Sequence, residues 1–175
     1  MKSLNLFKTM LMVIAVFSLG LVASGSSAGT FKEIKGQFKQ AYTKQEVLSV
    51  PQSEGLMIML TQSTGNGKST NGSGYMDGAQ VVIQEIADLK QGNGPHSGYA
   101  IQTMSNGDET VTRFFGEIST TLTPDGKPNT TFSGKWDTIS GKGQYTGITG
   151  NGTYNGYFIS ENEYVVDWSG YYFLQ

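Results

Sequence analysis

Residues suited to acid–base or metal chemistry are few in this chain of 175 residues. His96 is the sole histidine and cysteine is absent, which excludes histidine-cluster metal sites, thiolate zinc sites and cysteine nucleophiles. We therefore expect neither a metal nor a cofactor. His96 follows Pro95 in the glycine-rich segment 91–98, which predicts a turn. A solvated or loop-packed histidine is the simpler interpretation, and a catalytic histidine is the alternative.

Two glutamates in predicted strands are the candidate catalytic groups. Glu85 shares a strand face with Val81 and Ile83, because alternate residues of a strand point the same way. A carboxyl group among apolar neighbours is harder to ionise and can serve as a general acid or base. Glu117 lies near the end of the predicted strand 109–118. For both residues a solvated position is the simpler interpretation.

Arg113 is the only arginine and lies in the middle of the same predicted strand. Alternation places it on one face with Val111, Phe115 and Glu117. The simpler interpretation exposes this face to solvent. The alternative turns it inward, where a guanidinium group would orient a carboxylate or polarise a carbonyl.

Large aromatic residues also lie within predicted strands. Trp136 and Trp168 each adjoin an aspartate, and Tyr99 begins the run 99–104. Such residues on barrel strands are most often core. Alternatively they line a pocket for a flat or apolar ligand, and on this hypothesis the candidate ligand-binding residues are Tyr99, Arg113, Trp136 and Trp168.

The first 28 residues have the pattern of a secretory signal peptide. Lys2 and Lys8 precede an apolar run over 10–23, and the small residues of 26–28 suit cleavage. We expect an exported protein, periplasmic or extracellular, with no stable membrane span after cleavage. Without the two lysines, ten basic residues remain against fourteen acidic ones. This mildly acidic balance argues against nucleic acid as a partner.

The rest of the chain, 29–175, reads as short strands separated by turns. Asn106-Gly107 predicts a type I′ hairpin between the runs 99–104 and 109–118. The unit Gly-x-Tyr-x-Gly occurs at 143–147 and 152–156, which predicts two curved strands joined by a turn at 149–152. We expect a fully buried strand over 55–62, a polar loop over 63–74 and a final strand over 163–174.

Seven to nine such strands predict an all-β fold. A final strand that is aromatic on both faces would make a poor exposed edge, and barrel closure removes edges. The prediction is a single antiparallel up-and-down β-barrel of about eight strands over 29–175, with a sandwich as the alternative.

The spacing of glycines and aromatic residues resembles that of allene oxide cyclase barrel-like proteins. The motifs that carry the resemblance are Phe132-x-Gly134-x-Trp136, the glycine–tyrosine repeat 141–156, Val166-x-Trp168-x-Gly170-x-Tyr172, Asp77-Gly78-Ala79 and Gly92-x-Gly94-x-x-x-Gly98-Tyr99. The resemblance implies an eight-stranded barrel, related in shape to dirigent proteins and lipocalins, with a pocket inside. Family enzymes cyclise or isomerise apolar substrates without a cofactor. The resemblance assigns no catalytic residue here.

Three functional hypotheses follow. The first is a small barrel that binds a small apolar or amphipathic ligand. The second is a cofactor-independent cyclase or isomerase that uses Glu85 or Glu117. The third is an envelope or surface interaction protein whose barrel is a scaffold, with the loop 63–76 making the contacts.

Overall fold

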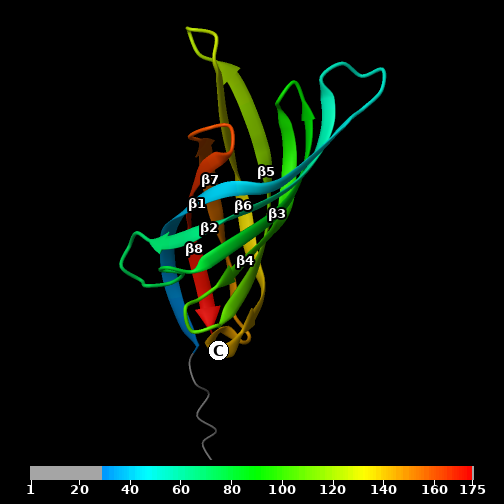
Figure 1. The fold of residues 1–175 in the computed structure, drawn as a ribbon. Coiled ribbons are helices and arrows are strands. Elements are labelled where there is room, and N and C mark those ends of the chain that lie inside the picture. The colour runs from blue at the N-terminus through cyan, green and yellow to red at the C-terminus, as the bar shows by residue number, and fades with distance from the viewer. Residues whose placement is uncertain (1–28, 175) are drawn as a thin grey trace, which may run out of the picture.

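Eight antiparallel strands close into one barrel in the computed structural model, which describes residues 29–174 (Figure 1). Each strand pairs with the next along the chain, and β8 returns to pair with β1. The strands are β1 (Thr30–Ser49), β2 (Leu56–Ser69), β3 (Gln80–Lys90), β4 (Gly94–Thr103), β5 (Glu109–Leu122), β6 (Pro128–Lys142), β7 (Thr149–Phe158) and β8 (Glu163–Leu174). The predicted all-β, up-and-down barrel is confirmed. The predicted signal peptide lies outside the described residues.

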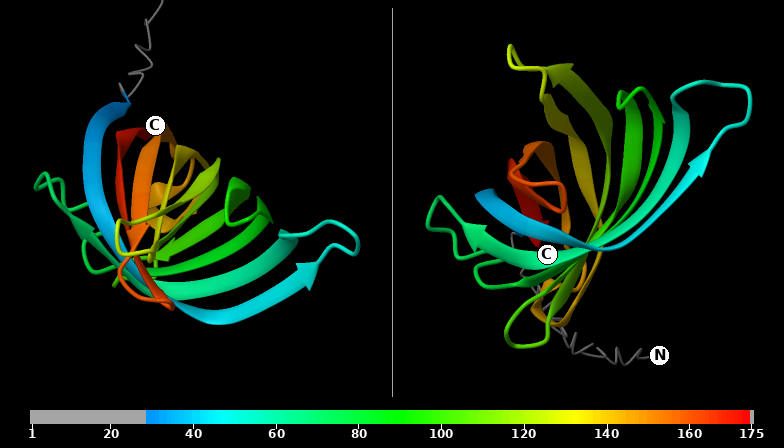
Figure 2. Two further views of the ribbon diagram at one scale, coloured as in Figure 1. Left: turned by 90° about the horizontal axis from the view of Figure 1, so that it is seen from above. Right: turned by 45° about the horizontal axis from the view of Figure 1, so that its top comes forward.

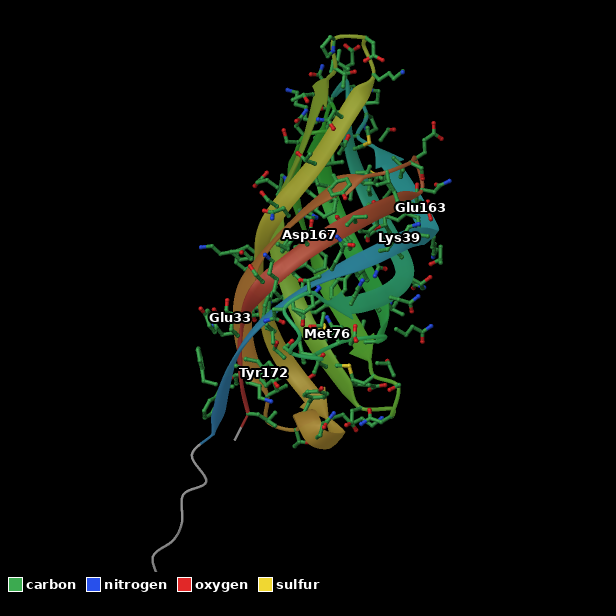
Figure 3. The ribbon with its side chains drawn as sticks, turned by 90° about the vertical axis from the view of Figure 1, so that its left-hand side faces the viewer. Glu33, Lys39, Met76, Glu163, Asp167 and Tyr172 are labelled. Carbon is green, nitrogen blue, oxygen red and sulfur yellow. The ribbon has the colours of Figure 1, made fainter. Side chains whose placement is uncertain are left out.

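One end of the barrel, here called the floor, is formed by the connections 70–79, 104–108 and 143–148. The β2–β3 connection folds into this end, where Tyr75 and Met76 are buried and Tyr75 packs against Trp168 and Tyr172. Figure 3 shows Met76 and Tyr172 on the half of the barrel nearest the floor. The prediction of a polar loop from residue 63 was wrong, because β2 continues to Ser69 before the chain turns inward.

The opposite end, here called the mouth, carries the four hairpins 50–55, 91–93, 123–127 and 159–162. Here β1 and β2 run beyond the rest of the wall, since β8 pairs with β1 only as far as Ala41 and the β1–β2 register shifts between Tyr42 and Lys44. Figure 2 shows this hairpin bending away from the barrel. The predicted full burial of 55–62 was wrong for the same reason: this part of β2 lies in the flared hairpin and is half-buried.

The glycine repeat forms one turn and one strand, with the turn earlier than predicted. A 3-10 turn, η1 (Gly143–Tyr145), follows β6, and Gly143 and Gly147 take positive φ of 69° and 78°. The segment 149–152, predicted as the turn, belongs to β7. Its glycines make room for rings, since a Cβ at Gly152 would lie 2.5 Å from the Trp136 indole.

The hairpin at Asn106-Gly107 lies where it was predicted, between β4 and β5. Its turn type differs, because Gly107 alone has a positive φ, of 84°. The Gly107 amide donates to the Met104 carbonyl at 2.9 Å, and the Met104 amide donates to the Asp108 carbonyl at 2.8 Å. This is a three-residue loop that ends on a left-handed glycine, not a type I′ turn.

Candidate functional site

A cavity of about 70 Å³ lies inside the barrel. Most of its wall is apolar, and nine aromatic side chains contribute to it: Phe38, Tyr42, Phe114, Phe132, Trp136, Tyr154, Phe158, Tyr164 and Trp168. Four of the lining residues carry other polar groups, namely Glu85, His96, Gln102 and Thr112. An apolar cavity with a few convergent polar groups is the usual form of a small-molecule site.

Three of the lining residues form a hydrogen-bonded chain across the interior. His96 Nδ1 lies 2.7 Å from Glu85 Oε1, and the Tyr154 hydroxyl lies 2.9 Å from His96 Nε2. The side chains of His96 and Glu85 are only 3% and 11% exposed. At the other carboxylate oxygen, Thr61 donates a long hydrogen bond of 3.4 Å. The chain therefore places one carboxylate and one imidazole in a largely apolar enclosure.

Strand register explains how Tyr154 reaches His96. Tyr154 on β7 pairs with Gly134 on β6, Gly134 pairs with Gly116 on β5, and Gly116 pairs with His96 on β4. The two side chains thus stand at the ends of one cross-strand row whose middle members are glycines. A Cβ at either glycine would lie 2.5 Å from the Tyr154 hydroxyl oxygen. The missing side chains let Tyr154 lie across bare backbone and meet the imidazole.

Glu85 reaches His96 from the neighbouring strand. It pairs with Gly98, while His96 pairs with Ala87, so the two side chains are diagonal neighbours on the inner face. Gly98 leaves the inner face open beside the carboxylate, and a Cβ there would lie 2.9 Å from the Phe114 ring.

The donors and acceptors of Glu85, His96 and Tyr154 indicate which of their atoms carry protons. Burial raises the pKa of Tyr154, with the Glu85 charge adding to the effect, so the hydroxyl keeps its proton. In the described chain the partner of this hydroxyl is His96 Nε2. Nε2 must therefore accept a hydrogen bond from the Tyr154 hydroxyl. The imidazole is then the neutral tautomer with its proton on Nδ1, which donates to Glu85. A doubly protonated His96 would leave the buried Tyr154 proton without an acceptor.

Two other buried hydroxyls lie close to the same carboxylate. Burial raises the pKa of Tyr42 and Tyr164, and the Glu85 charge contributes to both shifts. The Tyr164 hydroxyl lies 2.6 Å from Ser63 Oγ. Within residues 29–174, two buried N–H donors lack a partner, Gln40 Nε2 and Trp168 Nε1. The interior therefore retains hydrogen-bonding capacity that the protein itself does not use.

The predicted site residues lie at the interior cavity or on the outer wall, and Glu85 borders both the cavity and the outer groove that contains Tyr99 and Arg113. Trp136, Trp168 and Glu85 line the interior cavity. Tyr99, Arg113 and Glu117 lie on the outer wall, and none of them lines that cavity.

The inward interpretation of Arg113 is corrected by the register of β5, whose inner face carries Thr112 and Phe114. Arg113 is exposed and pairs with Asp137 at 3.0 Å, so its charge is solvated and compensated. Tyr99, 47% exposed, lines an outer groove of about 590 Å³ together with Arg113 and Phe115. Glu117 lines a second outer groove. These positions leave Glu85 as the one predicted acid that faces the cavity.

Sequence reasoning missed the roles of His96 and Tyr154. Pro95 and the glycines around it favour a turn, yet β4 begins at Gly94 and His96 lies in the strand. The available signal was alternation, since His96, Gly98 and Ala100 share the inner face.

Among residues 29–174 no group of three or more histidine, cysteine, aspartate or glutamate side chains is arranged to hold a metal ion. The same described part of the chain contains no helix long and apolar enough to cross a membrane.

The fold and cavity define a class: an eight-stranded up-and-down β-barrel with an aromatic-lined interior and one buried acid–imidazole–phenol chain. No protein-family model matches the chain, and no curated protein sequence matches it. Among solved structures, a pterocarpan synthase dirigent protein is similar at 13% identity, with a TM-score of 0.48 over 95% of this chain and 98% of that one. No function follows from a likeness at this level. The barrel assignment rests on the strand pairing itself, and membership of the allene oxide cyclase barrel-like family stays a prediction.

Proposed function

We propose that this protein is an exported barrel that binds a small molecule with an apolar body in its interior cavity. The observation that carries the proposal is the combination of an aromatic-lined cavity with a few polar groups that converge on it. Trp168 also lines the cavity, and its buried Nε1–H has no partner in the described chain, which supports the proposal because a ligand oxygen or a water can accept that hydrogen bond. The signal-like pattern of residues 1–28 supports export.

The cavity limits the size of the ligand. Its volume of about 70 Å³ is far below the roughly 300–1,000 Å³ of drug-sized sites. It is also about half of an engineered cavity of roughly 150 Å³ that binds benzene. A molecule of a few non-hydrogen atoms fits without rearrangement. A larger ligand requires a ring such as that of Tyr42 or Phe158 to move, since both line the cavity and are only partly buried.

Native mass spectrometry of the protein, purified gently from its host's envelope fraction, tests the proposal directly. We expect an additional mass that is lost on denaturation. Trp136 and Trp168 are the only tryptophans and both line the cavity, so intrinsic fluorescence reports occupancy. Ala100→Leu, which fills the cavity, should abolish the response, and Ser97→Leu on the outer side of the same strand should retain it. A clean mass and an unresponsive fluorescence would mean a filled barrel that acts through its surface.

A second candidate function is a cofactor-independent isomerase or cyclase. The observation in its favour is the Glu85 carboxylate, which faces a largely apolar cavity and is oriented by His96. In this role Glu85 would move a proton at its Oε2 atom, because Oε1 is occupied by the imidazole. Turnover of a substrate that persists in the double variant Glu85→Gln, Glu117→Gln would exclude it.

A further inference from the structure

The interior holds one acidic side chain, Glu85, which forms no ion pair with a lysine or arginine of the described chain. Glu85 contacts His96 and Thr61, and the cavity lining contains neither lysine nor arginine. Glu85 also borders the outer groove, where Lys44 and Arg113 pair with Glu46 and Asp137 instead. The lysine and arginine ion pairs within residues 29–174 lie at exposed or half-buried positions and use other acids: Lys39–Glu163, Lys44–Glu46, Arg113–Asp137, Lys127–Asp125 and Lys142–Glu109.

His96 orients the Glu85 carboxyl group, and in its neutral tautomer it adds no positive charge. The neutral tautomer satisfies both of its neighbours, because Nδ1–H donates to Glu85 and Nε2 accepts from Tyr154. A second proton on the imidazole would remove the acceptor that the Tyr154 hydroxyl needs. With this tautomer the contact is a hydrogen bond from Nδ1–H to Glu85, and an ionised Glu85 gives the pair a net charge of about −1.

The surroundings of the carboxylate suit a cation. The rings of Phe114, Phe132 and Tyr154 each lie within 6 Å of the His96 ring centroid and line the same cavity as Glu85. Aromatic faces carry negative potential and attract ammonium groups, more strongly where water is excluded. A buried unpaired charge is costly, and a bound counter-ion removes that cost.

We infer that the ligand carries a small cationic amine, held by the Glu85 carboxylate and by aromatic faces of the cavity. The inference rests on the proposed function, since it requires that the cavity accept a ligand. The volume of about 70 Å³ favours a short alkylammonium group over a bulky one.

Three probes of similar size and different charge test the inference: ethylammonium, ethanol and acetate. Binding to the full mature chain is followed by tryptophan fluorescence and by calorimetry, with sodium chloride at matched ionic strength as the blank. We expect ethylammonium to bind at least about tenfold more tightly than ethanol, and acetate not to bind. Glu85→Gln should remove the preference, Glu85→Asp should retain part of it, and Glu117→Gln on the outer wall should leave it unchanged.

The outcomes separate the inference from the proposed function. Equal binding of ethylammonium and ethanol would overturn the inference and leave the proposed function standing. A preference for acetate would also overturn it, and would mean a cationic His96. No response to any probe, together with a clean native mass, would overturn both. The selectivity of the unaltered protein decides these outcomes even if Glu85→Gln fails to fold.

Discussion

Trp136 and Tyr154 are accommodated in the barrel in the same way, each lying over a pair of glycines that face each other across two strands. The Tyr154 hydroxyl lies against Gly116 and Gly134, and the Trp136 indole lies against Gly152 and Gly170. In both cases the ring occupies space that is free because the two glycines carry no side chain. The glycines that identify the fold in the sequence are also what allows the acid–imidazole–phenol chain to form.

Gly134→Ala should disrupt this arrangement. The new methyl group would lie 2.5 Å from the Tyr154 hydroxyl oxygen and closer still to the Phe115 carbonyl, so the backbone or Tyr154 must shift. We expect a loss of about 1–3 kcal/mol in the free energy of unfolding, as for other overpacked cores. Urea denaturation measures it, with Ser133→Ala, exposed on the same strand, as the control. Stability equal to that of the control would mean that Tyr154 does not occupy this position.

Tyr154→Phe keeps the ring and removes only the hydroxyl that donates to His96 Nε2. A buried acceptor would then lack its partner, which costs about 1–3 kcal/mol. Tyr157→Phe, on the same strand with a half-exposed ring, is the matched control and should change stability little. NMR of the imidazole nitrogens gives a second measurement: the tautomer with its proton on Nδ1 should predominate in the unaltered protein, while two protonated nitrogens would contradict the assignment.

Strand alternation predicted most of the fold and which residues share a strand face, but not which face points inward. It placed Arg113 and Phe115 together on one face of β5, and the structure puts that face outside. It also placed β8 over 163–174 with Trp168 and Tyr172 on one face, and both are buried. Local pattern suffices in these cases because the inner and outer faces of a barrel differ sharply in polarity.

The acid–imidazole–phenol chain could not be predicted in this way. His96 and Tyr154 are 58 residues apart, and their contact depends on the relative register of four strands. The register of these strands depends on barrel closure, on the irregularity between Val111 and Thr112 in the β5–β6 pairing and on the turn at 143–148, whose position was mistaken. Local signals also misled at His96, since proline and glycine indicate a turn even where they occupy the first residues of a strand.

The stability of the barrel floor should depend on one side chain of the β2–β3 connection, that of Tyr75. Tyr75 is 3% exposed and packs against Tyr172, Trp168 and Tyr145, edge-on to the last two. Tyr75→Ala removes this contact and should cost about 3–5 kcal/mol, as other large aromatic truncations do. Thr70→Ala, exposed in the same connection, is the control. A small effect of Tyr75→Ala would support the interpretation of this segment as a contact loop, which its burial argues against.

Alkaline pH should unfold the barrel through its buried phenols. Burial raises the pKa of Tyr42, Tyr75, Tyr154 and Tyr164 above the ordinary value of 10.0. The folded chain therefore keeps protons that the unfolded chain has already lost above pH 10. Below pH 10 these groups should not change the free energy of unfolding. Above pH 10 that free energy should fall by about 1.4 kcal/mol per pH unit for each phenol.

Two spectroscopic signals check this expectation together. Tyrosinate absorbance should rise first for the exposed phenols, with a second step that coincides with the loss of far-ultraviolet circular dichroism. Tyr154→Phe removes one of these phenols and should make the decline of stability with pH shallower by about 1.4 kcal/mol per pH unit, whatever its effect on stability at neutral pH. Complete ionisation of all tyrosines in a barrel that stays folded would contradict the burial of these hydroxyls, and with it the enclosed environment on which the amine site depends.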